Sequence, residues 1–329
     1  MHARISSSSY AALAVVWLCL AAAPWLLPNS YLLNLFITGL INLLLISSLN
    51  LLMGYAGQIS LAHAAFYGLG AYTSGVLSAK FGVSPWLGMA AAGLLTGVAA
   101  AAIGWPALKL RGHYLAMATL GFNAIVSVLF VELYGLTGGP NGLSNVPPLS
   151  LPGLSLQTDQ SFYYFALVVV GVAMLLLLNL LDSRSGRALR ALSSAEVGAA
   201  CMGVDVHRYK VFVFVLSAMM AALAGCLYVH HNTFVSPESF EFGVSIMLVV
   251  MVALGGTGHF WGAFVGALVY TALPELLRAF GDFELLIYGL ALVLVLLFFP
   301  RGAGGVIDWL VTRRSRAAAP SGAAARAAQ

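Results

Sequence analysis

A series of apolar segments of nearly membrane-spanning length is the feature that most constrains how this chain can fold. A helix needs ~20 mainly apolar residues to cross the hydrocarbon core of a bilayer, and in lipid only helices or closed barrels satisfy every backbone polar group. The segments lie at about 10–27, 31–53, 59–79, 85–108, 114–134, 161–181, 211–229, 241–255, 260–279 and 284–299. They predict an all-α, polytopic membrane helix bundle. Because 241–255 and others are short, we expect about 8–10 transmembrane helices.

Composition excludes the soluble classes of protein. The 329 residues are 61% hydrophobic and 8% charged, whereas about a quarter of the residues in a soluble domain are charged. The net charge of +4 does not indicate nucleic acid as a partner, because the basic residues are scattered through the loops without an aromatic stacking platform. Cys19, Cys201 and Cys226 lack the spacing of a disulfide framework or a metal site.

The distribution of positive charge predicts the orientation. A long polar passage, 182–210, separates two apolar segments and carries five basic residues. Cytoplasmic loops are enriched in lysine and arginine. With the N-terminus inside, all of the 15 lysines and arginines except Lys80 and Arg278 face the cytoplasm. We therefore expect both termini and 182–210 to be cytoplasmic.

The remaining loops and the termini complete the predicted organisation. Residues 1–305 form a transmembrane domain, and the basic, alanine-rich tail 306–329 is expected to be disordered. The loop 135–160 has no lysine or arginine and is placed outside; its glycine-rich run 138–142 is either a tight turn or a contact for an external partner. Ala21–Ala23 resembles a signal-peptidase site, but the apolar run continues past it, so we expect a retained first helix.

The sequence lacks the motifs of the commonest catalytic and nucleotide-binding sites. The phosphate loop G-x-x-x-x-G-K-[ST] is absent, as are HExxH and GxSxG. Embedded acid and base pairs, which a proton-coupled carrier usually needs, are also absent from the centres of the apolar segments. The sequence therefore predicts a transport subunit that is not an enzyme and whose energy comes from elsewhere.

Polar residues in one apolar segment are candidates for a substrate pathway. His63 is the most conspicuous ionisable residue inside such a segment, and Gln58 and Ser60 precede it; Gly57 and Phe66 complete the set. Ionisable residues within a membrane are functional candidates, and interrupted backbone there can line a cavity. A neutral histidine bonded to the backbone is an equally good interpretation of His63.

Two glycine clusters, 54–57 and 255–258, each precede a helix rich in small residues. Transporters often carry internal repeats, and this similarity is a weak indication of one. Small residues in the helices themselves predict close helix packing.

Motifs spread over 31–305 resemble one family. They are Asn50-Leu51-Leu52-Met53-Gly54-Tyr55-Ala56-Gly57-Gln58-Ile59-Ser60-Leu61-Ala62-His63-Ala64-Ala65-Phe66-Tyr67-Gly68, Leu110-Arg111-Gly112-His113-Tyr114-Leu115-Ala116, Thr119-Leu120-Gly121-Phe122, Thr137-Gly138-Gly139-Pro140-Asn141-Gly142-Leu143, Gly186-Arg187-Ala188-Leu189-Arg190-Ala191, Gly203-Val204 with Arg208-Tyr209-Lys210, Ser236-Pro237-Glu238-Ser239-Phe240, Leu254-Gly255-Gly256-Thr257-Gly258 and Pro300-Arg301-Gly302. In this order they resemble the branched-chain amino-acid ABC importer permeases, specifically the second, M-type subunit of high-affinity leucine, isoleucine and valine systems. The chain departs from that pattern at Asn123, where an acidic residue is common, and at His113.

The resemblance implies a complex in the bacterial inner membrane. The partners would be a second, homologous permease, two ABC ATPase subunits that bind ATP and magnesium, and an external solute-binding protein. This chain itself would hold no cofactor. The cytoplasmic passage would contain the coupling helix, so that Arg184, Arg187, Arg190, Glu196 and Gly203 become candidates for ATPase coupling.

The function implied is import of branched-chain amino acids by alternating access. A mostly apolar pathway suits an aliphatic zwitterion but suits urea or short amides as well, since similar permeases carry them. A stand-alone channel or secondary carrier is the alternative from another class, and 182–210 would then be a plain solvated connector.

Overall fold

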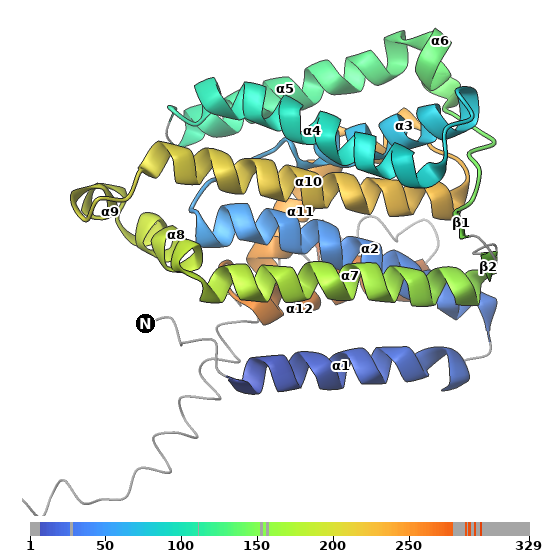
Figure 1. Cartoon of the computed structure of the whole chain (residues 1–329), viewed down its shortest axis with the longest axis horizontal. Helices are drawn as coiled ribbons and strands as arrows, with labels where there is room; N and C mark the ends of the chain where they lie inside the picture. The colour runs from blue at the N-terminus through green and yellow to red at the C-terminus, as the bar shows by residue number, and fades with distance from the viewer. Residues whose placement is uncertain are drawn as a thin grey trace, which may run out of the picture.

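The structure is a bundle of long helices that lie alongside one another (Figure 1). It is a computed structural model that describes residues 7–26, 29–110, 112–151, 154–155, 158–278 and the separate positions 287, 289, 290, 293 and 297. The α-helices are α1 (Ser7–Leu26), α2 (Ser30–Asn50), α3 (His63–Lys80), α4 (Pro85–Ala107), α5 (His113–Glu132), α6 (Tyr134–Thr137), α7 (Asp159–Asp182), α8 (Arg184–Ser194), α9 (Glu196–Cys201), α10 (Val206–Asn232), α11 (Phe242–Gly255) and α12 (Phe260–Leu277). The all-α prediction is confirmed.

Short elements connect the helices. A π-helix, η1 (Leu51–Tyr55), continues α2, and two 3₁₀ turns, η2 (Gly139–Asn141) and η3 (Pro237–Phe240), follow α6 and α10. Strands β1 (Ser150–Leu151) and β2 (Leu154–Ser155) form a small antiparallel hairpin. This hairpin is the sheet structure within the described residues, and it does not change the fold class.

Six helices in the described part of the chain are long and apolar enough to cross a membrane: α2 with η1, α4, α5, α7, α10 and α12. The apolar helices α1, α3 and α11 accompany them. α11 has 14 residues, in agreement with the shortness predicted for 241–255. The predicted segment 284–299 and the tail 306–329 lie outside the continuously described residues, so these two predictions stay predictions.

The core of the bundle is built on α2, α3 and α10. Every residue from 40 to 52 is buried, which is typical of a helix enclosed by others. α10 packs along both α3 and α4, and α2 packs against α7, α10 and α12. A Cβ atom placed on Gly70 or Gly225 would collide with backbone of the facing helix. Glycine therefore allows α3 and α10 to approach at backbone contact, as small residues do between membrane helices.

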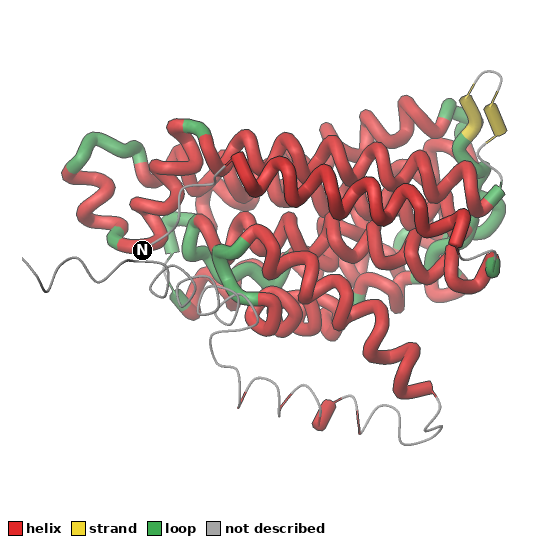
Figure 2. Tube along the Cα trace, turned by 90° about the horizontal axis from the view of Figure 1, so that it is seen from below, coloured by secondary structure: helices red, strands yellow, loops and turns green. Residues whose placement is uncertain are grey.

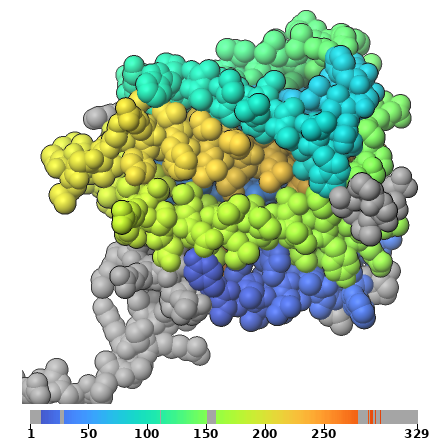
Figure 3. Space-filling model, viewed as in Figure 1, coloured from blue at the N-terminus to red at the C-terminus, as the bar shows by residue number. Residues whose placement is uncertain are grey.

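One face of the bundle shows α4, α10, α7 and α1 side by side (Figure 3). Its outward side chains are large and apolar; Leu94, Val98 and Leu176 are each more than 60% exposed. A soluble protein rarely exposes a contiguous patch of this kind. The face has the character of a surface that contacts lipid.

The two ends of the bundle differ. α8 and α9 project at one end, and α6 with the β1–β2 hairpin lies at the other (Figures 1 and 2). At the hairpin end, Leu143 and Val235 exchange two backbone hydrogen bonds of 2.8 and 3.0 Å, which fix the loop after α6 to the loop after α10. The glycine run preceding Leu143 adopts positive φ at 138, 139 and 142. The run therefore forms a tight turn, and the alternative role as a contact for an external partner stays a prediction.

Short polar side chains begin several helices. The Asn29 side chain accepts a hydrogen bond from Tyr31 N at the start of α2, and Asp205 accepts one from Arg208 N at the start of α10. Such caps satisfy backbone N–H groups that have no partner inside the helix. They explain why α10 begins at residue 206, five positions before the predicted apolar segment.

Candidate functional site

The first motif of the resemblance forms a break between two helices. α2 passes into the π-helix η1, and Gly57 then adopts a φ of +67°, which favours glycine. The Gln58 N–H donates to the Leu52 carbonyl at 3.2 Å. Residues 57–62 are not helical, so the prediction of a continuous segment from 59 is wrong at its start. π-helical segments are frequent at functional sites, and non-helical backbone at membrane depth is found where it is enclosed by protein or lines a cavity.

Side chains from two other helices bind backbone N–H groups in this break and in the first turn of α3 that follows it. Leu61 N donates to the Thr119 hydroxyl of α5, and Ala64 N donates to the Ser245 hydroxyl of α11, both at 3.0 Å. An unpaired N–H group in an apolar interior costs several kcal/mol, by order of magnitude. The two hydroxyls thus stabilise the interrupted backbone by hydrogen bonding, and they connect α5 and α11 to it.

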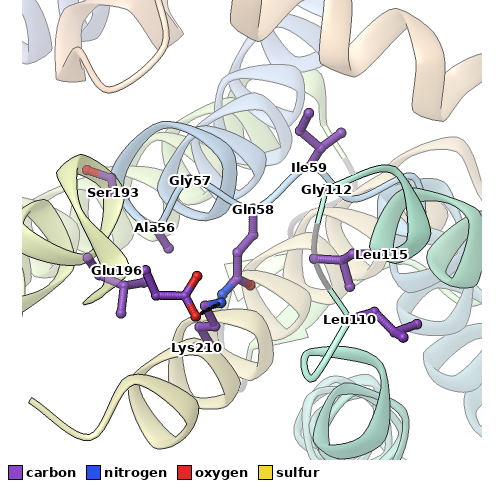
Figure 4. Close-up of a pocket in the computed structure, with 11 residues that line it drawn as sticks. Ala56, Gly57, Gln58, Ile59, Leu110, Gly112, Leu115, Ser193, Glu196 and Lys210 are labelled. Carbon is purple, nitrogen blue, oxygen red and sulfur yellow. Dashed lines mark ion pairs between the residues drawn. The ribbon is translucent and has the colours of Figure 1, made fainter. Parts of the chain in front are cut away.

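A pocket of about 260 Å³ opens beside the break (Figure 4). Its residues come from the break, from the α4–α5 turn with the start of α5, and from the α8–α10 region. They are Ala56, Gly57, Gln58, Ile59, Leu110, Gly112, Leu115, Leu192, Ser193, Glu196 and Lys210. The pocket therefore places predicted pathway residues beside residues of the predicted coupling passage.

An ion pair and an amide are the polar groups that define the pocket. Lys210 Nζ lies 3.0 Å from Glu196 Oε1, with the lysine side chain 10% exposed and the glutamate side chain 31% exposed. Gln58 is 3% exposed, and neither its amide nitrogen nor its amide oxygen has a hydrogen-bond partner. In Figure 4 the Gln58 amide lies close to the ion pair. A buried amide without partners is costly, so its presence needs a functional explanation.

The other predicted pathway residues lie deeper. His63 is completely buried at the start of α3; neither ring nitrogen makes a hydrogen bond of good geometry, although the Ser48 carbonyl lies nearby. The Ser60 hydroxyl accepts from Ala62 N at 3.3 Å. Phe66 packs in an aromatic cluster. The structure thus brings Gly57 and Gln58 to the pocket and places Ser60, His63 and Phe66 in the core behind it.

Two of the arginines predicted to act in coupling bind backbone carbonyls at the corner between α7 and α8. Arg190 Nη1 donates to the Leu181 carbonyl at 2.9 Å, and Arg187 Nη1 donates to the Asp182 carbonyl at 3.2 Å. Cations that bind the last carbonyls of a helix complement its dipole. A Cβ on Gly186 would collide with the Leu181 carbonyl. Hydrogen bonds thus hold Arg187 and Arg190 at this corner, although Arg187 is exposed, as is Arg184.

α9 presents the most exposed surface at this end. Val197 is 69% exposed and Met202 is 86% exposed, and Gly203 ends the element with a φ of +81°. α8 packs inward through Leu189 and Leu192 and contacts η1. α9 therefore offers an apolar patch outside the bundle and, through Glu196, reaches the pocket on its inner side.

Sequence reasoning missed Lys210 as a pocket residue. It counted this lysine as cytoplasmic charge, although Lys210 lies one turn into α10 and is buried. An ionisable residue at the edge of an apolar span is a functional candidate, and this was the available signal. In the described residues, no group of three His, Cys, Asp or Glu side chains comes together as a metal site.

Residues 31–299 match the sequence model of a family described as "Branched-chain amino acid transport system / permease component". The permease LivM of Escherichia coli K12, a high-affinity branched-chain amino acid transport protein, is 34% identical over 277 residues; the match covers 77% of this chain and 65% of LivM. LivH of Salmonella typhimurium LT2 is 27% identical over 273 residues, covering 77% of this chain and 87% of LivH.

A probable LivM of Methanocaldococcus jannaschii is 25% identical over 215 residues, covering 60% of this chain and 61% of that protein. The chain thus spans about 65% of the length of the bacterial LivM proteins that it matches. No solved structure matches it. The matched range contains both the break at 57–62 and the Glu196–Lys210 pair, and the chain belongs to the family of branched-chain amino acid transport permeases.

Proposed function

We propose that the chain is the transmembrane permease subunit of an ABC importer for branched-chain, aliphatic amino acids. The observation that carries this proposal is the pocket, which joins an interrupted membrane segment to the projecting element α9. The family's printed description and the functions printed for LivM and LivH support the substrate class. ATP hydrolysis is assigned to partner subunits, because the sequence has no phosphate loop.

The complex contains a second permease, two ATPase subunits with their ATP and magnesium, and an external solute-binding protein. The charge distribution supports an orientation in which α8 and α9 face the cytoplasm of a bacterial cell and both termini lie on that side. ATP-driven movement at α9 shifts the bundle between two arrangements, one open to each side. α9 is suited to this because it has an exposed apolar face and a charged contact inside the bundle.

Reconstitution tests the class of transporter. Proteoliposomes that contain all five proteins should take up leucine only with ATP inside the compartment that α9 faces and with the binding protein on the other side. Vesicles with this chain alone should show no flux above that of empty vesicles. Flux of leucine through the chain alone would contradict the proposal and favour a channel or secondary carrier; ATP-dependent uptake of urea instead of leucine would change the substrate.

A pull-down tests the contact with the ATPases. Val197→Asp combined with Met202→Asp places charge on the exposed face of α9 and should reduce co-purification of the ATPase subunits at least tenfold. Phe234→Asp is the matched control, because Phe234 is 45% exposed at the opposite end of the bundle. If the α9 variant retains the ATPases as well as the control does, the docking face lies elsewhere.

A further inference from the structure

The amide of Gln58 is the strongest unexplained feature of the pocket. Its donor and its acceptor are both buried without a hydrogen-bond partner, and the residue is only 3% exposed. An unmade hydrogen bond in a buried site is expensive, whereas a ligand that supplies the missing partners recovers that cost. An amide oxygen can accept a hydrogen bond from a cationic group while the amide NH₂ donates one to an anionic group.

The ion pair beside Gln58 offers the same two complementary functions with full charges. Lys210 has an ammonium group with three donors, and its contact with Glu196 Oε1 uses one of them. A carboxylate has about four acceptor positions. The pair can therefore take a ligand that carries both an anion and a cation without leaving either protein charge unpaired.

Apart from Ser193, the remaining side chains that line the pocket are apolar. Leu110, Leu115 and Leu192 line it from three different elements, and about 260 Å³ is slightly below the roughly 300–1,000 Å³ typical of pockets for drug-sized ligands. A molecule of the size of a single amino acid fits this range. Leucine side chains on several sides favour an aliphatic group over a polar one.

We propose that this pocket is a binding site for the zwitterionic head of an aliphatic amino acid at the α9 end of the pathway, an inference that rests on the proposed function. Lys210 Nζ and the Gln58 NH₂ group donate to the ligand carboxylate. Glu196 and the Gln58 carbonyl accept from the ligand ammonium group. The aliphatic side chain packs against the leucines.

The arrangement has two consequences for selectivity and coupling. Urea and short amides have no charges to place between Lys210 and Glu196, so the site distinguishes amino acids from neutral amides. Glu196 also begins α9, the element assigned to the ATPases. A movement of α9 thus displaces one wall of the site and releases the ligand.

The experiment measures binding of radiolabelled L-leucine to the purified complex in nanodiscs, without the solute-binding protein, by scintillation proximity. Gln58→Leu should weaken leucine binding about tenfold, because it removes both amide hydrogen bonds to charged groups. The charge exchange Glu196→Lys with Lys210→Glu keeps an ion pair and so protects the fold. It should weaken binding at least tenfold, because the ligand carboxylate and ammonium then meet like charges.

Ligand analogues test which groups are recognised. Leucinamide, which lacks the carboxylate, and 4-methylpentanoate, which lacks the ammonium group, should each compete at least tenfold more weakly than leucine. The matched control variant is Glu275→Gln with Arg278→Gln, which removes an exposed ion pair at the end of α12 and should bind leucine as the unaltered complex does.

The outcomes separate this inference from the proposed function. If the unaltered complex imports leucine with ATP but the Gln58 and charge-exchange variants bind leucine normally, the pocket is not the site and the importer assignment stands. Competition by both analogues as strong as that of leucine would likewise overturn the inference. If the complex imports no aliphatic amino acid at all, the proposed function fails and the site proposal fails with it.

Discussion

α10 contains two regions that are packed in opposite ways. Around Gly225 it touches the backbone of α3, where a Cβ atom would collide with the Tyr67 carbonyl. Around Lys210, near its start, it borders a pocket of about 260 Å³ and an amide without partners. One helix thus carries both a close-packed contact and an incompletely satisfied polar site.

The difference shows how the molecule divides rigidity and adaptability. Close backbone packing between α3 and α10 leaves no room for relative movement around Gly225, in the last third of α10. The pocket end is held by hydrogen bonds and one ion pair, which can exchange partners at lower cost. Substitutions in the first region should therefore lower the stability strongly. Substitutions in the second region should lower it weakly or raise it.

The largest effect is expected for Gly225→Ala. The added methyl group meets the Tyr67 carbonyl and lies 2.8 Å from Ala71 N, so α3 and α10 must separate. Overpacking of this kind costs about 3 kcal/mol. The midpoint of SDS-induced unfolding in mixed micelles measures it. Gly93→Ala is the control, because no atom lies within 4 Å of that added methyl group; equal stability losses in the two variants would remove the distinction drawn for α10.

Asn50→Ala should have the next largest effect. Asn50 Nδ2 donates to the His259 carbonyl at 2.9 Å, and its Oδ1 accepts from Gly258 N at 3.0 Å. The substitution leaves two backbone groups without these partners and costs about 2 kcal/mol. The same unfolding assay measures it, with Asn232→Ala as the control, since Asn232 makes one exposed hydrogen bond to Tyr228. A loss of stability no greater than that of the control would show that Asn50 does not hold the end of α2 to the loop between α11 and α12.

Gln58→Leu should be neutral or should raise stability by about 1 kcal/mol, because it removes a buried amide that satisfies no protein group. The same variant should bind leucine less well, as described above. A gain in stability together with a loss of binding is the pattern expected of a functional site. A clear loss of stability would mean that the amide has a structural partner, and the contrast between the two regions of α10 would disappear.

The smallest effect is expected for Arg208→Gln. Arg208 Nε lies 3.0 Å from Asp205 Oδ2, but the two side chains are 80% and 52% exposed. Exposed pairs of this kind contribute about 0.5 kcal/mol or less. The unfolding midpoint should stay within that range, and raising the salt concentration should remove the remaining difference. A larger loss would mean that Arg208 also supports the Glu196–Lys210 pair, whose lysine lies two residues further along α10.

The long apolar helices were predictable because length and hydropathy decide them locally. Nine of the ten predicted segments coincide with α1–α5, α7 and α10–α12, apart from residues 59–62 and the earlier start of α10. The tenth, 284–299, lies outside the continuously described residues. Before α3, the glycine at 57 and the Thr119 hydroxyl of α5 support a non-helical backbone, and the Ser245 hydroxyl of α11 binds the first turn of α3. Those supports come from residues far along the chain, so local apolarity could not reveal the break.

The candidate site was only partly predictable for the same reason. Gln58 was identified from its place in an apolar segment, but its neighbours Glu196 and Lys210 meet only because α9 folds back toward α10. The two glycine clusters were compared as members of a repeat, yet Gly54 and Gly258 face each other in the structure. The interpretation of Arg187 and Arg190 as coupling residues did not anticipate that both bind carbonyls at the end of α7.

The corner at Gly186 has a mechanical consequence. Ser183 caps α8, Arg190 reaches back to α7, and glycine at 186 removes the last space between the two helices. A joint without slack transmits displacement in full, whereas a flexible linker absorbs it. A displacement of α8 is therefore passed on to α7, and the two helices move as one rigid body.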